Sequence, residues 1–77
     1  MRVGELIRKK REHLGLTQAE LGTKVGMSGQ FISNIERFES LPPKKSIHKM
    51  MTVLKINRNE MMSIMRKEYA DKLTGMI

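Results

Sequence analysis

The sequence predicts an all-α fold built from five short helices. No window of the 77 residues alternates apolar and polar side chains over the length of a strand, and aromatic residues make up only 4% of the chain. Apolar residues instead recur at the spacing of one helix face. Glycines and prolines divide these periodic stretches from one another.

The first helix is predicted over roughly residues 2–14, with Gly15 in the usual C′ role after its end. Thr17 starts the second helix, because Thr17-Gln-Ala-Glu20 fits a capping box, in which the Thr hydroxyl and the Glu carboxylate satisfy free amides at the helix start. Gly26 stops this helix. The side chains expected to face inward from the first three helices are Val3, Leu6, Ile7, Leu14, Leu21, Val25, Ile32 and Ile35.

Ser28 is a good N-cap for the third helix, which is expected over residues 28–37. The stretch 39–44 is a turn, because its two consecutive prolines cannot sit inside a helix. A fourth helix is expected over about residues 44–54, and a fifth over about residues 58–74.

The composition excludes several classes of function. The chain has no Cys, which excludes disulfides, zinc ribbons and thiol chemistry, and its two isolated His do not assemble a metal site by themselves. No nucleophile–base pair is evident, so we expect neither catalysis nor a cofactor. No apolar run approaches the ~18 residues that span a bilayer. The charged N-terminus is not a secretory signal, and a cytoplasmic protein is therefore expected.

The charge balance predicts a polyanionic partner. The formal net charge is +7, which favours nucleic acid before an anionic membrane. The charge is uneven, because residues 17–40 carry two basic and three acidic side chains, whereas residues 1–16 and 41–60 each carry five basic ones. A slightly acidic middle segment between basic flanks is not the pattern expected of a protein that coats the nucleoid without sequence specificity.

Residues 17–37, TQAELGTKVGMSGQFISNIER, form a helix, a Gly-containing turn and a second helix, which is the helix-turn-helix pattern. With these residues the chain resembles the Cro/phage-repressor (Xre) family of helix-turn-helix regulators. The matching residues are Ile7, Arg11, Gly15-Leu-Thr-Gln18, Glu20-Leu21, Gly26, Ser28, Ile32-Ser-Asn-Ile-Glu36 and Pro43. The resemblance covers residues 3–62. It implies a compact five-helix, repressor-like domain over residues 1–62 that binds double-stranded DNA. The helical extension expected over residues 63–77 is a departure from the family.

The outer face of the third helix is predicted to read bases. Its two isoleucines set the inward direction, and at about 100° per residue the polar side chains fall on or near the opposite side. Gln and Asn bind adenine bidentately, and Ser donates or accepts. Gly29 lies where the family commonly reads a base. Because glycine has no side chain, it would either let the backbone approach the DNA closely or leave one base unread. Phe31 either packs against the fourth helix or touches a thymine methyl. The predicted base-reading residues are Gly29, Gln30, Ser33 and Asn34.

Phosphate contacts are expected where helix starts present free amides and the positive end of the dipole. The resemblance places Thr17 and Gln18 at such a start, with Gln18 as the phosphate clamp, and two lysines at the start of the fourth helix. The predicted DNA-backbone contacts are Thr17, Gln18, Ser28, Arg37, Lys44 and Lys45, of which Arg37 could reach either a phosphate or a base.

Arg11 and Glu36 are expected to be structural. In the proteins that the chain resembles, the equivalent side chains form a partly buried ion pair between the first and third helices.

Two other positions depart from the family. Phe38 stands where relatives usually have Gly, and it would be strained at a positive φ. Gly22 replaces a common Ala at a cost of roughly 0.8–1 kcal/mol in helix propensity, for which close packing is the expected reason.

The C-terminal extension carries a stripe of apolar residues, Met61, Met65, Tyr69 and Leu73, one every four positions. A monomer has little surface left for such a stripe to cover, so these residues are predicted to form a two-fold homodimer contact. The alternative is that the stripe folds back on the first helix.

These features lead to a sequence-specific transcriptional regulator as the main hypothesis. It would be a repressor that binds a palindromic operator as a homodimer, with helix 28–37 in the major groove. The alternative is a protein-interaction module or an antitoxin-type regulator that binds a protein partner, which the apolar tail and Phe31 motivate. The polar outer face of the third helix argues against this as the main role.

Overall fold

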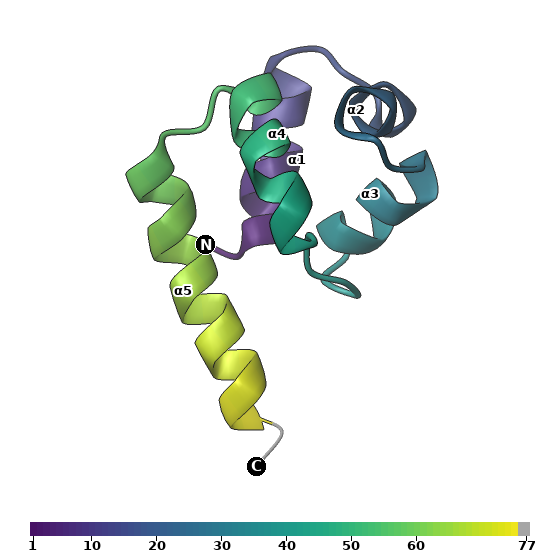
Figure 1. Cartoon of the computed structure of the whole chain (residues 1–77). Coiled ribbons are helices and arrows are strands. Elements are labelled where there is room, and N and C mark those ends of the chain that lie inside the picture. Colours follow the sequence, from purple (N-terminus) through teal and green to yellow (C-terminus); the bar gives the residue numbers. More distant parts are fainter. Residues whose placement is uncertain (76–77) are drawn as a thin grey trace.

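The computed structural model describes the backbone of residues 1–75 and the side chains of residues 1–70. In this range the chain forms helices and no strand, which confirms the all-α prediction (Figure 1). The helices are α1 (Val3–His13), α2 (Gln18–Val25), α3 (Gly29–Glu36), α4 (Lys44–Leu54) and α5 (Arg58–Gly75). α3 packs against α2 and α1, α4 packs on α2, and α5 packs chiefly on α1 and extends past the other helices (Figure 1).

Local caps set the helix ends where the sequence predicts them. The hydroxyl of Thr17 accepts a hydrogen bond from the backbone N–H of Glu20 at 3.0 Å, and the Glu20 carboxylate accepts one from the N–H of Thr17 at 2.8 Å. Ser28 caps the start of α3 in the same way, through its side-chain oxygen. After α1 and α2, Gly15 and Gly26 take positive φ values of 72° and 76°, which glycine adopts without strain.

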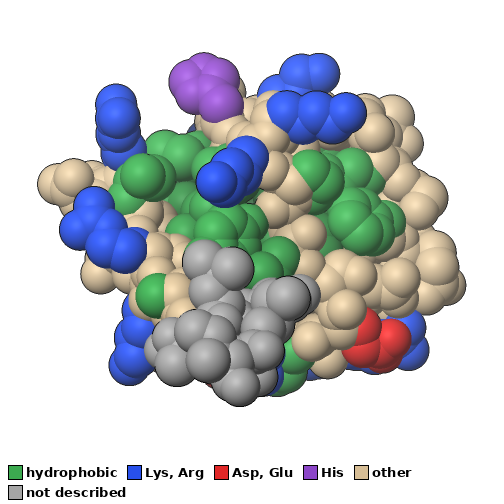
Figure 2. All heavy atoms as spheres, turned by 60° about the horizontal axis from the view of Figure 1, so that its bottom comes forward, with side chains coloured by type: hydrophobic (Ala, Val, Ile, Leu, Met, Phe, Trp, Pro, Cys, Tyr) green, Lys and Arg blue, Asp and Glu red, His purple; other side chains and the backbone are tan. Residues whose placement is uncertain are grey.

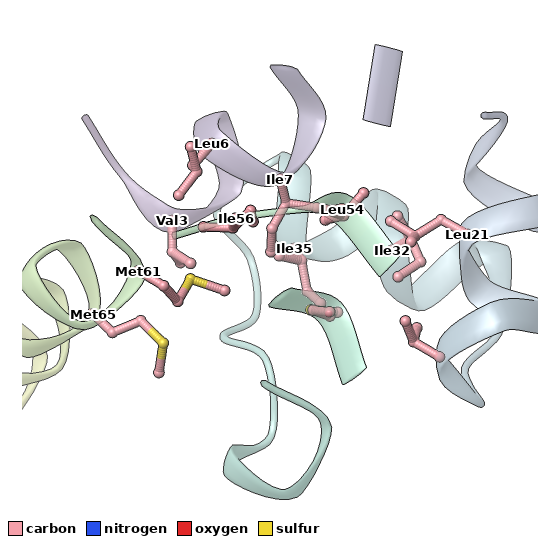
Figure 3. Close-up of a cluster of buried hydrophobic side chains, with 12 residues drawn as sticks. Val3, Leu6, Ile7, Leu21, Ile32, Ile35, Leu54, Ile56, Met61 and Met65 are labelled. Carbon is pink, nitrogen blue, oxygen red and sulfur yellow. The ribbon is translucent and has the colours of Figure 1, made fainter. Parts of the chain in front are cut away.

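The core is one continuous apolar cluster, to which all five helices contribute (Figure 3). Its members are Val3, Leu6, Ile7, Leu21, Val25, Ile32, Ile35, Met50, Leu54, Ile56, Met61 and Met65. Of the inward side chains predicted for the first three helices, Leu14 alone is only half-buried, at the edge of this cluster. Each fully buried side chain of this size contributes about 1.5–3 kcal/mol, so the cluster is the main source of stability.

The structure corrects the expectation of a homodimer contact for two residues of the α5 stripe, Met61 and Met65. Met61 is 0% and Met65 6% exposed, and both belong to the core of a single copy. Tyr69 is half-buried, and its hydroxyl donates a hydrogen bond to the backbone carbonyl of Pro42 at 2.6 Å. Met61 is thus closed to a second copy, Met65 keeps only a small exposed edge, and Tyr69 is tied to the loop before α4. Leu73 lies outside the residues whose side chains are described.

Polar contacts hold α5 against α1. The Glu68 carboxylate accepts a hydrogen bond at 2.8 Å from the backbone N–H of Val3, in the first turn of α1, where free amides attract negative charge. The guanidinium of Arg2 lies 3.9 Å from the same carboxylate. Farther along, Lys10 lies 3.9 Å from Glu60. Of the stripe, Met61 and Met65 lie in the core together with Val3, Leu6 and Ile7 of α1, as the alternative expectation has it for these two residues.

Phe38 ends α3 with a φ of 65°, a left-handed conformation that usually requires glycine. The next backbone N–H, of Glu39, donates to the carbonyl of Asn34 at 2.8 Å, which closes the helix. The guanidinium carbon of Arg2 lies 4.0 Å from the centre of the Phe38 ring. This cation–π contact offsets part of the strain that the sequence predicts for a bulky residue here.

Among the described residues, none of the helices has both the length and the apolar content that crossing a membrane requires.

Candidate nucleic-acid interface

Two glycines allow α2 and α3 to approach closely. A Cβ on Gly22 would stand 2.5 Å from the carbonyl oxygen of Met27, in the turn between the two helices. A Cβ on Gly29 would stand 3.0 Å from the Cα of Ala19. Close packing therefore explains Gly22, as expected. A side chain at position 29 would therefore point toward α2. If this predicted base-reading position contacts DNA, it does so through its backbone.

The exposed face of α3 carries a connected set of polar side chains. The amide nitrogen of Gln30 donates to the side-chain oxygen of Asn34 at 3.0 Å, and the guanidinium of Arg37 donates to the same oxygen at 2.9 Å. Gln30 and Arg37 are exposed, whereas Ser33 and Asn34 are half-buried. The structure thus brings Gln30, Asn34 and Arg37 together on the side of α3 away from its buried isoleucines. Phe31 is half-buried and packs against the core.

The start of α2 presents an exposed hydroxyl next to a half-buried amide. Thr17 accepts the capping hydrogen bond and keeps its own O–H proton as a donor. The backbone N–H of Thr17, followed by its hydroxyl, holds the pKa of Glu20 below its usual range. The side-chain amide of Gln18, the predicted phosphate clamp, donates to Oε1 of Glu36 at 3.1 Å. Because a primary amide has two N–H groups, a second donor remains for a phosphate.

Arg11 and Glu36 form the expected ion pair between α1 and α3. The Nε of Arg11 lies 2.6 Å from one carboxylate oxygen of Glu36, and Nη2 lies 3.0 Å from the other. The remaining terminal nitrogen, Nη1, donates to the carbonyl of Leu16 at 2.7 Å. The two side chains are only 11% and 4% exposed. The hydrogen bond with Glu36 raises the pKa of Arg11.

The first turn of α4 carries two exposed lysines, Lys44 and Lys45. The N-cap is Pro43, and no side chain caps this helix start. Cations are unfavourable at the positive end of a helix dipole, so these two lysines do not stabilise α4 on its own. An anion held between the lysines and the free amides would remove this conflict.

The fold brings the predicted DNA-contacting residues of α2 and α3 close to one another. The first turn of α2 touches both ends of α3, through Gln18 with Glu36 and through Ala19 with Gly29. The loop 37–43 returns the chain from α3 to the start of α4, where the two lysines lie (Figure 1). Sequence reasoning missed the hydrogen bonds of Gln18 with Glu36 and of Gln30 and Arg37 with Asn34. The spacing of four between Gln30 and Asn34 is the one signal that could have indicated the second set.

Comparison with known proteins agrees with this geometry. A family model described as helix-turn-helix matches residues 7–61. The chain is also similar to the ImmF control region 10 kDa protein of Bacillus phage phi105, with 31% identity over 58 residues. The match covers 75% of this chain and 64% of the relative, so it spans less than two thirds of the relative's length. No solved structure matches the chain. The chain belongs to the Cro/phage-repressor family of helix-turn-helix DNA-binding regulators.

Proposed function

We propose that this protein is a sequence-specific transcriptional repressor that binds double-stranded DNA with α3 in the major groove. The observation that carries the proposal is the exposed face of α3, where the amides of Gln30 and Asn34 and the guanidinium of Arg37 lie together. These are side chains that hydrogen-bond to base edges, and an α-helix fits the width of the major groove. The similarity to a phage control-region protein supports a regulatory role.

The DNA backbone is held by groups at helix starts. Thr17 and Gln18 at α2, Ser28 at α3, and the two lysines of α4 supply hydroxyl, amide and ammonium donors. Such contacts fix the position of the protein on the duplex without reading its sequence. They also make the affinity depend on salt, because each neutralised phosphate releases counterions.

A homodimer on a palindromic operator extends this proposal. A single α3 of eight residues reaches only a few base pairs, so one copy has limited specificity. Two copies related by a two-fold axis would place their α3 helices in successive major grooves, about 34 Å apart. Because Met61 and Met65 are buried within each copy, other residues must form the contact between the copies. In this proposal the protein acts by binding, without catalysis.

Selection from a randomised DNA duplex pool at about 150 mM salt tests the proposal. We expect an enriched, approximately palindromic sequence, with half-site centres about one helical turn apart. A reporter gene with this sequence across its promoter should then lose expression when the protein is present, whereas an increase would indicate an activator. A pool without enrichment, together with binding that disappears in salt, would overturn the proposal.

A further inference from the structure

A groove of about 840 Å³ lies between α4 and α5. It exists because α5 packs chiefly on α1, which leaves the facing sides of α4 and α5 apart. Figure 2 views the molecule from the side of the free end of α5. On this face, hydrophobic side chains gather in the centre and Lys and Arg side chains lie around them. None of the residues assigned to base reading lines this groove.

The floor of the groove is apolar and follows helical spacing. Ile47 and Met51 lie one turn apart on α4, and Met62, Met65 and Tyr69 follow one another at intervals of three and four on α5. Ile47 and Met51 are half-buried, and Met62 is 41% exposed. Two such rows form a trough that matches the apolar face of another helix. Methionine side chains adapt their shape to the partner that they contact.

The rim of the groove is basic. Lys44, His48, Arg58 and Arg66 line it and are exposed, and within the described part of the chain no acidic residue lines it. Nor does any of these four side chains form an ion pair with another described residue. An apolar floor with a rim of one charge sign selects a partner of the opposite sign.

We propose that this groove binds an amphipathic helix of a protein partner, one that is apolar on one face and carries Asp and Glu along both flanks. The apolar face would cover Met51 and Met62, and the acidic flanks would pair with Arg58 and Arg66. A second copy of the chain fits less well. In a two-fold contact the same surface meets itself, so the arginines of one copy would face those of the other. This proposal does not rest on the base-reading residues, although Lys44 belongs both to the rim of the groove and to the proposed DNA-backbone contacts.

The test uses the full chain with isotope-labelled methionine methyl groups, because methionines lie both in the groove and away from it. The probe is a synthetic helical peptide of about five turns, with Leu on one face and Glu along its flanks. A matched peptide carries Lys in place of every Glu. We expect the Glu peptide to shift the methyl signals of Met51, Met62 and Met65 and to leave that of Met27, in the α2–α3 turn, unchanged. The Lys peptide should shift none of them.

Charge reversal on the protein then identifies the contact. The double variant Arg58→Glu/Arg66→Glu should bind the Glu peptide about 10-fold more weakly or worse, and should now bind the Lys peptide. Lys9→Glu, on the exposed side of α1, is the matched control and should change the affinity less than about 2-fold. Circular dichroism confirms that each variant keeps its helices.

Three results would overturn the proposal. One is equal binding of both peptides, which would leave apolar contact without charge selection. Another is failure of the Glu peptide to shift the groove methyls. The last is concentration-dependent self-association that shifts these same signals without any peptide, which would assign the groove to a second copy.

Discussion

Gln18 on α2 and Arg11 on α1 share one carboxylate oxygen of Glu36 on α3. The distances to this oxygen are 3.1 Å from the Gln18 amide and 3.0 Å from Nη2 of Arg11. A single buried side chain therefore joins three helices, and two of these form the motif that is proposed to contact DNA. The orientation of α3 relative to the start of α2 depends on this joint.

Replacing one member of the Arg11–Glu36 pair should be much more harmful than replacing both. Arg11→Met leaves the Glu36 carboxylate buried with only Gln18 as a donor, and we expect the free energy of unfolding to fall by about 3 kcal/mol. Arg11→Met/Glu36→Leu removes both charges and should recover much of that loss. Urea denaturation of the three proteins measures the difference. A double variant no more stable than Arg11→Met would show that an unpaired charge is not the cause.

Gly22→Ala should destabilise the protein, although alanine is the better helix former. Its propensity gain of about 0.8–1 kcal/mol is opposed by a Cβ that would stand 2.5 Å from the carbonyl oxygen of Met27. Because backbone must move, we expect a net loss of about 1–3 kcal/mol in urea denaturation. Thr23→Ala, exposed on the same helix, is the control and should change little. A more stable Gly22→Ala would mean that the turn relaxes without cost.

The strain at Phe38 can be measured by comparing two substitutions that both remove the ring. Phe38→Ala and Phe38→Gly both lose the contact with Arg2, but only glycine adopts a φ of 65° freely. The left-handed conformation costs a non-glycine residue about 1–2 kcal/mol. We therefore expect the Gly variant to be about 1 kcal/mol more stable than the Ala variant, after allowance for the greater freedom of glycine in the unfolded chain. Equal unfolding midpoints would refute a strained backbone at this position.

Glu68→Ala should weaken the attachment of α5 to α1. The Val3 amide would lose its acceptor, and such a cap contributes about 1 kcal/mol. We expect a lower midpoint in thermal unfolding, with Lys67→Ala as the exposed neighbouring control. An unchanged midpoint for Glu68→Ala would show that water replaces the carboxylate fully.

Two substitutions should separate base reading from phosphate binding on the selected operator. Asn34→Ala should cost about 1–3 kcal/mol on the operator and much less on random DNA, because it removes a bidentate partner of a base. Lys45→Ala should weaken binding to both DNAs alike and lower the salt slope by about one. Fluorescence anisotropy titrations at several salt concentrations measure both effects. Equal losses on both DNAs for Asn34→Ala would remove this residue from the base-reading set.

The helix boundaries could be predicted because their signals are local. Thr17 and Glu20 satisfy each other across a single turn, and Gly26 ends the same helix by its own conformational freedom. The polar face of α3 was predictable for a similar reason, since two inward isoleucines fix the direction of every other side chain on a short helix.

The environment of α5 could not be predicted in the same way. Spacing showed that Met61 and Met65 share a face, but not which surface covers that face. The answer depends on Val3 and Glu68, which are separated by 65 positions and meet only after the domain has closed. The link from Gln18 to Glu36 and the contact of Gly29 with α2 were missed for the same reason, because both depend on where two helices cross.

The contact between Val3 and Glu68 also has a consequence for synthesis on the ribosome. α1 leaves the exit tunnel before the other four helices, yet the group that caps it belongs to α5, which emerges after them. Until α5 emerges, the side of α1 that α5 covers is open to chaperones and to neighbouring nascent chains. The three helices before the loop 37–43 can assemble around their own apolar side chains, but the domain closes only when Met61, Met65 and Glu68 have emerged. The contact between α1 and α5 therefore forms late, only after Glu68 has left the exit tunnel.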